Sequence, residues 1–165
     1  MTALEQIRSL YEYNEWANNH VLAASGGLSE EEFGREQGAS FGSVRGNLAH
    51  VVAGQIVWLG RWTSSPPQLL SELQAAQGID AIRGMYEASH DGLRQFVASL
   101  KDGDLTHIIA YVDSRGEANE RRLGQLMLHL ANHGTHHRAE TAMVLTSLGK
   151  PPRQLDYLFF ELERA

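Results

Sequence analysis

Apolar residues recur at helical spacing along four long stretches of the chain. The first runs from Leu4 to Ala24, the second from Ser43 to Trp62, the third from Ile79 to Leu100 and the fourth from Arg121 to Leu148. Residues three and four apart share one face of a helix, so each stretch predicts an amphipathic helix. Four such helices predict an all-α four-helix bundle.

The connections between these stretches are unequal in length and carry their own signals. Ser29 followed by Glu32 is a capping-box pattern, which predicts a short capped turn. Residues 106–112 look extended and precede a turn at Asp113–Gly116, which predicts either a short hairpin or an irregular crossover. A last short helix is expected from Asp156 to Glu163. We therefore expect long crossover connections and a short C-terminal helix.

Length and composition exclude several functional classes. The 165 residues, 1–165, are expected to form one domain with its own core. The chain has no cysteine, which excludes disulfides, thiolate ligands and a cysteine nucleophile. A net charge of −6 argues against nucleic-acid binding. No apolar run approaches the roughly 20 residues of a membrane span, and no signal-peptide pattern is present, so we expect a cytoplasmic protein.

Histidines are concentrated in the fourth stretch. Half of the eight histidines lie between His129 and His137, and His129, His133 and His137 are four residues apart. Imidazoles four apart on a helix can converge on one transition metal. His129 and His137 are about 12 Å apart along the axis, too far to share an ion. The pair is therefore either His129/His133 or His133/His137, and His136 points away from both.

A third ligand must come from another helix. His50 is the leading candidate, because it lies in the apolar segment Leu48–Val52, where an unpaired imidazole is costly to bury. The alternative is a core histidine that donates to a backbone carbonyl. His20 is the next candidate, whereas His90 and His107 have polar neighbours and are expected to be solvated.

Several segments in the same order resemble one known group of proteins. The chain resembles the DinB-like (DinB/YfiT) superfamily of metal-dependent enzymes at Tyr13–Asn18, Leu48–His50, Trp58–Leu59, Asn132–Arg138 and Leu148–Leu158. The resemblance covers nearly the whole chain. It implies a DinB/YfiT-like four-helix bundle that forms a homodimer.

The resemblance also implies a divalent metal, zinc or nickel, held by three histidines. Carried over by position, these ligands are His50, His133 and His137. Better-understood relatives include thiol-dependent transferases and isomerases, which implies a similar activity on a small-molecule substrate, with a low-molecular-weight thiol as cofactor. One alternative is a hydrolase that uses a metal-activated water. Another is a non-catalytic metal-binding bundle with a role in stress response.

The chain departs from the pattern of these relatives near the proposed site. Ala139 and Glu140 stand where glycine and glutamine are common, and Gln55 stands where an acidic residue is frequent. Gln55 argues against a general base at that position. Glu140 either orients a ligand imidazole, accepts a proton, or pairs with Arg138 or Arg122 at the surface. We favour the surface pairing.

Overall fold

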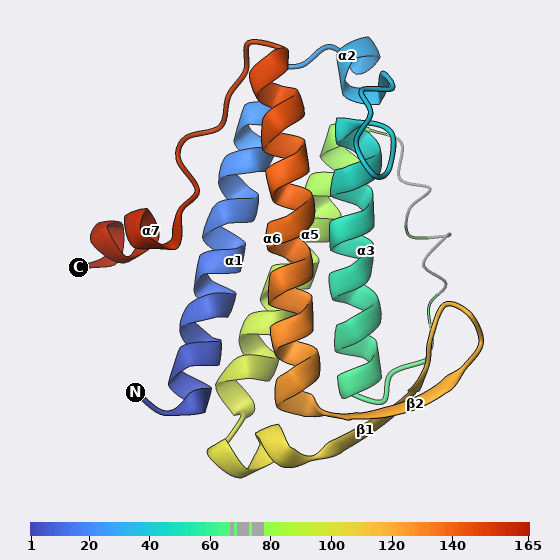
Figure 1. Ribbon diagram of the computed structural model, residues 1–165, viewed down its shortest axis with the longest axis vertical. Helices are drawn as coiled ribbons and strands as arrows, with labels where there is room; N and C mark the ends of the chain where they lie inside the picture. The colour runs from blue at the N-terminus through green and yellow to red at the C-terminus, as the bar shows by residue number, and fades with distance from the viewer. Residues whose placement is uncertain (67, 69–72, 74–77) are drawn as a thin grey trace.

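The computed structural model describes residues 1–66, 68, 73 and 78–165. Its four long helices run side by side and form the predicted four-helix bundle (Figure 1). They are α1 (Ala3–Ser25), α3 (Val44–Trp62), α5 (Ile79–Ser99) and α6 (Leu123–Ser147). Each of α1 and α3 contacts both α5 and α6, so the helices close a ring. No helix in the part of the chain that the structure describes is long and apolar enough to cross a membrane.

Serine side chains cap the start of two successive helices, the second of which carries His50. At the start of α2 (Glu30–Gly34), the Ser29 hydroxyl accepts from the Glu32 amide, and the Glu32 carboxylate accepts from the Ser29 amide. This capping box confirms the predicted capped turn. The Ser43 hydroxyl caps α3 in a similar way.

An antiparallel hairpin crosses one end of the bundle between α5 and α6 (Figure 1). A 3-10 turn, η1 (Asp102–Thr106), leads into β1 (Ile108–Val112), which pairs with β2 (Ala118–Arg122). The hairpin interpretation is confirmed, and the irregular crossover is wrong. The expected helix start at Arg121 is two residues early, because Arg121 is still paired with β1 and α6 begins at Leu123.

The C-terminal helix α7 (Tyr157–Arg164) lies against α1. Both chain ends are therefore on the α1 side of the bundle (Figure 1). The Tyr13 hydroxyl donates to the Leu155 carbonyl at 2.8 Å, just before α7. Phe160 is buried, and its ring centroid lies 5.9 Å from those of both Tyr13 and Trp16. The expected short C-terminal helix is confirmed, and aromatic packing holds it on α1.

Two apolar clusters fill the bundle, and buried polar side chains separate them. One cluster includes Leu93 and Leu130, and the other includes Val52 and Ile82. Along each long helix, the residues between the two clusters include buried polar side chains, which we call the polar layer: Asn14 and Asn18 of α1, Gln55 of α3, Ser89 and His90 of α5, and Arg138 and Thr141 of α6. Buried polar groups are tolerated where hydrogen bonds replace those lost to water.

Arg138 is at the centre of this polar layer and is only 2% exposed. Its Nη1 donates to Oδ1 of Asn14 and, at 3.0 Å, to Oδ1 of Asn18. The other end of the Asn18 amide contacts His90 Nε2 at 3.1 Å. Gly134 leaves room for this arrangement, because a Cβ there would lie 2.6 Å from Asn14 Oδ1 and 2.8 Å from Arg138 Nη1. Amide oxygens therefore solvate the buried guanidinium.

Candidate metal centre

Three histidines from two neighbouring helices converge in the structure. His50 of α3 and His133 and His137 of α6 each offer a ring nitrogen within 4.8 Å of the other two. The Nε2 atoms of His50 and His133 are 2.9 Å apart. Nitrogens bound at 2.0–2.1 Å to one tetrahedral metal lie about 3.3 Å apart, which is close to this spacing. The donor set could therefore hold one metal ion, and the pair on α6 that meets His50 is His133/His137.

Glu140 orients His137 from the next turn of α6. His137 Nδ1 lies 3.0 Å from Glu140 Oε2, and because a carboxylate only accepts, Nδ1 carries the proton and Nε2 keeps its lone pair. Ser40 and Asn47 also donate to this carboxylate, at 2.5 and 3.1 Å. Burial raises the pKa of Glu140, but the hydrogen bonds from Ser40 and His137 outweigh burial and lower it to about 2. Glu140 is therefore ionised and held in place at neutral pH.

His133 is the more deeply enclosed of the other two imidazoles. Burial lowers its pKa to about 3, with further lowering by His50 and His137, so the ring is neutral as a metal ligand must be. The ring lies beside Gly54 of α3, where a Cβ would be 3.4 Å from His133 Cε1, an ordinary van der Waals contact. Within the described residues, the buried Nδ1 of His133 has no hydrogen-bond partner. His133 thus lacks the oriented support that Glu140 gives His137.

The loop between α2 and α3 covers His50. The Phe41 ring stacks on the imidazole with centroids 3.6 Å apart and planes 17° from parallel. Phe41 is held there because its amide donates to Asn47 Oδ1 at 3.0 Å. Burial, and then His137, lower the pKa of His50 to about 4. The loop therefore limits access of water to His50, while Phe41 itself is 40% exposed.

The other two histidines of α6 lie beside this cluster. His129 is exposed and packs its ring 5.5 Å from Trp58, outside the three-histidine group. His136 is exposed, and its Nε2 lies 3.3 Å from Glu140 Oε1. His136, His137 and Glu140 form a second group that could hold an ion. That group would use the carboxylate that now orients His137, so the three-histidine group is the more complete donor set.

Two expectations for single histidines have different outcomes. His107 is exposed, as expected. The expectation that His90 is solvated is wrong, because this side chain is only 5% exposed. The polar neighbour that suggested solvent, Asp91, is exposed because it lies on another face of α5, while His90 faces the bundle interior. His20 is half-buried beside Trp16 and is not part of the three-histidine cluster.

The surface interpretation of Glu140 is also wrong. Its partners are Ser40, Asn47, His136 and His137, whereas Arg138 points into the polar layer. Gln55 accepts a hydrogen bond from Ser89 of α5 at 2.9 Å, so it serves the bundle interior.

Sequence reasoning missed the supporting residues Ser40, Phe41 and Asn47. One signal for Asn47 was present, because it precedes His50 by three residues and so shares its helix face. The loop residues could not be found in this way, since their contact with α6 spans about a hundred residues of sequence.

Two comparisons with known proteins bear on this site. The family model described as "DinB family" matches residues 1–164. Protein DinB from Bacillus subtilis (strain 168) is 24% identical over 153 residues, which cover 90% of this chain and 89% of that protein. The family-model match includes all the described helices and all three converging histidines. The chain therefore belongs to the DinB family.

Proposed function

We propose that the protein is a cytoplasmic enzyme that binds one divalent transition metal, zinc or nickel, through His50, His133 and His137. The observation that carries this proposal is the convergence of three imidazoles from α3 and α6. Burial lowers the pKa of two of them, His50 and His133, and so keeps these two rings neutral. Glu140 supports it, because the ring N–H of a metal-bound histidine commonly donates a hydrogen bond to a carboxylate.

The leading activity is a thiol-dependent transferase or isomerase reaction on a small-molecule substrate. A divalent metal on three neutral ligands retains its charge and an open position, where it would lower the pKa of a bound thiol or water. The thiol has to be a low-molecular-weight cofactor, because the chain has no cysteine. Glu140 keeps His137 in one tautomer, and Phe41 keeps His50 oriented and shields it from water.

Metal content tests the site directly. Protein purified without a chelator or a polyhistidine tag is expected to contain about one zinc or nickel ion per chain. The His133→Ala/His137→Ala variant is expected to contain none, and the matched His129→Ala variant should retain the wild-type content. Full retention of metal in the double variant, or no binding after reconstitution with zinc and with nickel, would disprove the site.

A substrate panel separates the possible reactions. The metal-loaded protein is incubated with low-molecular-weight thiols and electrophilic acceptors, and in parallel with hydrolysable esters and amides. Thiol adducts that require His50 are expected. Ester or amide hydrolysis without thiol transfer would instead identify a metal-dependent hydrolase. Metal that raises the melting temperature without turnover of any substrate would identify a non-catalytic binding bundle.

We also propose that the protein is a homodimer. The exposed apolar side chains Tyr157, Leu158 and Leu162 of α7 support this assembly, because a soluble monomer gains nothing from exposing them together. Sedimentation equilibrium is expected to give twice the chain mass of 18.3 kDa. A mass equal to that of one chain at all concentrations would refute the dimer.

A further inference from the structure

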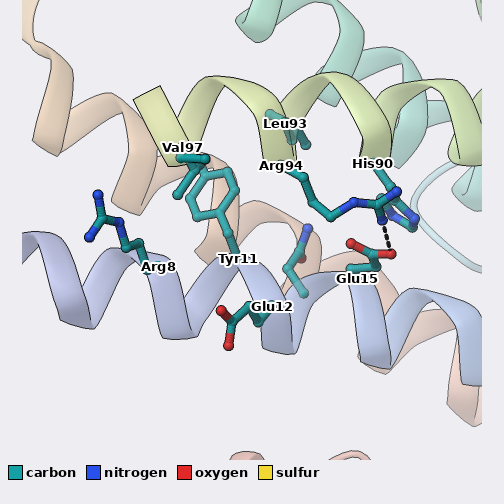
Figure 2. Close-up of a pocket in the computed structure, with 10 residues that line it drawn as sticks. Arg8, Tyr11, Glu12, Glu15, His90, Leu93, Arg94 and Val97 are labelled. Carbon is teal, nitrogen blue, oxygen red and sulfur yellow. Dashed lines mark hydrogen bonds and ion pairs between the residues drawn. The ribbon is translucent and has the colours of Figure 1, made fainter. Parts of the chain in front are cut away.

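A groove of about 530 Å³ lies between α1 and α5. Because the four helices close a ring, this groove is across the bundle from the α3–α6 side that carries the three histidines. Arg8 and Val97 lie toward one end of it, and His90, Arg94 and Glu15 toward the other (Figure 2). Its volume falls in the range of about 300–1,000 Å³ that is typical of small-molecule sites.

The walls of the groove are apolar. Tyr11, Leu93 and Val97 line it, and all three side chains are buried against the first apolar cluster. The Tyr11 hydroxyl donates to the Met127 carbonyl at 3.1 Å, so this polar atom is already used in the interior. The walls therefore favour a ligand with an apolar body.

The floor of the groove presents hydrogen-bond donors from two deeply buried residues, Asn14 and His90, which are 3% and 5% exposed. Asn14 uses Oδ1 to accept from Arg138, so its free end is the Nδ2 amide. The oxygen of Asn18 also accepts from Arg138, so Asn18 Nδ2 donates to His90 Nε2. The proton of a neutral His90 ring is then on Nδ1.

These donors have no acceptor within the part of the chain that the structure describes. No hydrogen bond joins Asn14 Nδ2 or His90 Nδ1 to a protein atom there. Neither nitrogen is among the fully buried polar atoms without a partner, so both open onto the groove. A ligand oxygen in the groove could therefore accept from both donors in place of water.

The charge around the groove favours an anionic oxygen. The charged lining residues are two arginines and two glutamates, Arg8, Arg94, Glu12 and Glu15, whose formal charges cancel. Arg94 also pairs with Asp91, whose negative charge is screened because its side chain is exposed to solvent. Behind the floor is Arg138, for which no carboxylate partner is found among the described residues. This buried cation leaves the floor with a positive excess.

The geometry points to a binding site for a small amphipathic monocarboxylate between α1 and α5. Its carboxylate accepts hydrogen bonds from Asn14 Nδ2 and His90 Nδ1. Its apolar chain lies along Tyr11, Leu93 and Val97 toward Arg8. The site is independent of the proposed metal, since none of the three clustered histidines lines the groove.

Octanoate is the probe that tests this site, with octylamine as a probe of equal chain length and opposite charge. Titration into the full chain, followed by calorimetry and ¹H–¹⁵N NMR, is expected to show saturable octanoate binding, shifts at Asn14 and His90, and no octylamine binding. Ala98 is exposed and lines the groove, so Ala98→Trp should weaken octanoate binding at least about tenfold. Ala81→Trp, at an exposed alanine of the same helix outside the groove, should not.

Further variants separate this site from the metal centre and from loss of folding. His50→Ala should bind octanoate as the wild type does, even without metal, and binding lost in this variant would overturn the proposal. His90→Phe keeps a ring but removes a donor, so it should weaken octanoate binding while leaving the circular dichroism spectrum unchanged. Absence of saturable octanoate binding, or equal affinity for octylamine, would also overturn the proposal. An Ala98→Trp variant that dissociates a dimer but binds octanoate normally would also overturn the proposal, because the groove would then be a contact between two copies of the chain.

Discussion

The two sides of the bundle border the same polar layer but present opposite chemistry. On the α3–α6 side, His50, His133 and His137 offer ring lone pairs. On the α1–α5 side, Asn14 and His90 offer protons, with a buried guanidinium behind them. Neutral imidazole lone pairs select a cation, whereas proton donors near a fixed positive charge select an anion.

The difference begins at two consecutive residues of α6. His137 contributes to the three-histidine cluster beside α3, and Arg138 points to the asparagines of α1. Successive residues on a helix are about 100° apart, so one turn can serve both sides. A different neighbouring residue sets the chemistry on each side. Glu140 accepts from His137 Nδ1, which leaves the lone pair on Nε2. Arg138 donates to the oxygens of Asn14 and Asn18, so the amide donors of these residues point away from Arg138.

The largest expected effect concerns metal affinity. His50→Ala should weaken zinc binding on the order of a thousandfold, because it removes one of three protein ligands. His90→Ala, on the other side of the layer, should leave zinc affinity unchanged. Competition titration with a chromophoric chelator measures both. Equal losses in the two variants would show that the sides are not independent.

The next largest effect concerns stability. Arg138→Met should lower the free energy of unfolding by about 3 kcal/mol, because two buried amide oxygens lose their donor. Arg121→Met, at an exposed position of β2, should change it by less than about 0.5 kcal/mol. Urea unfolding checks the pair. A stable Arg138→Met protein would mean that the amides find other partners.

His90 should make stability depend on pH. Burial lowers the pKa of His90 from 6.5 to about 4. Between these pH values the unfolded chain binds a proton that the folded chain does not, so this histidine makes the folded state less stable as pH falls through that window. His90→Gln should therefore remove about 2 kcal/mol of the loss between pH 7 and pH 5. His107→Gln, at an exposed position, is the control, and parallel pH profiles for wild type and His90→Gln would contradict this expectation.

The smallest effect concerns the orientation of His137. Glu140→Leu should weaken zinc binding by about tenfold, because His137 Nδ1 loses its acceptor. Glu140→Gln keeps an acceptor oxygen and should lose less. Zinc titrations of the two variants at pH 7 measure the difference. Identical zinc affinities in the wild type and both variants would mean that metal binding does not depend on the hydrogen bond from His137 to Glu140.

Much of the architecture follows from local sequence signals. Helical periodicity predicts the four long helices to within about two residues at their ends, because most buried positions on each helix are apolar and recur at helical spacing. The spacing of His133 and His137 predicts a shared face in the same way. The choice between His129 and His137 as the partner of His133 needed the resemblance, because periodicity alone is equal for both.

What the sequence could not reveal are the partners that come from other helices. The burial of His90 depends on Asn18 and Arg138, which approach from α1 and α6. The role of Glu140 depends on a loop about a hundred residues earlier in the chain. Such contacts are set by packing between elements, which neither propensity nor period encodes.

Gly134 makes the effects of substitutions at several positions depend on one another. Any side chain there would meet both the Arg138 guanidinium and the Asn14 amide, and the side-chain oxygens of Asn14 and Asn18 both accept from Arg138. Replacing one of these four residues alone leaves the other three mismatched, so their mutational effects cannot add independently. Relatives that lack the buried arginine are therefore expected to differ at all four positions. Substitutions in α1 and α6 should accordingly occur together.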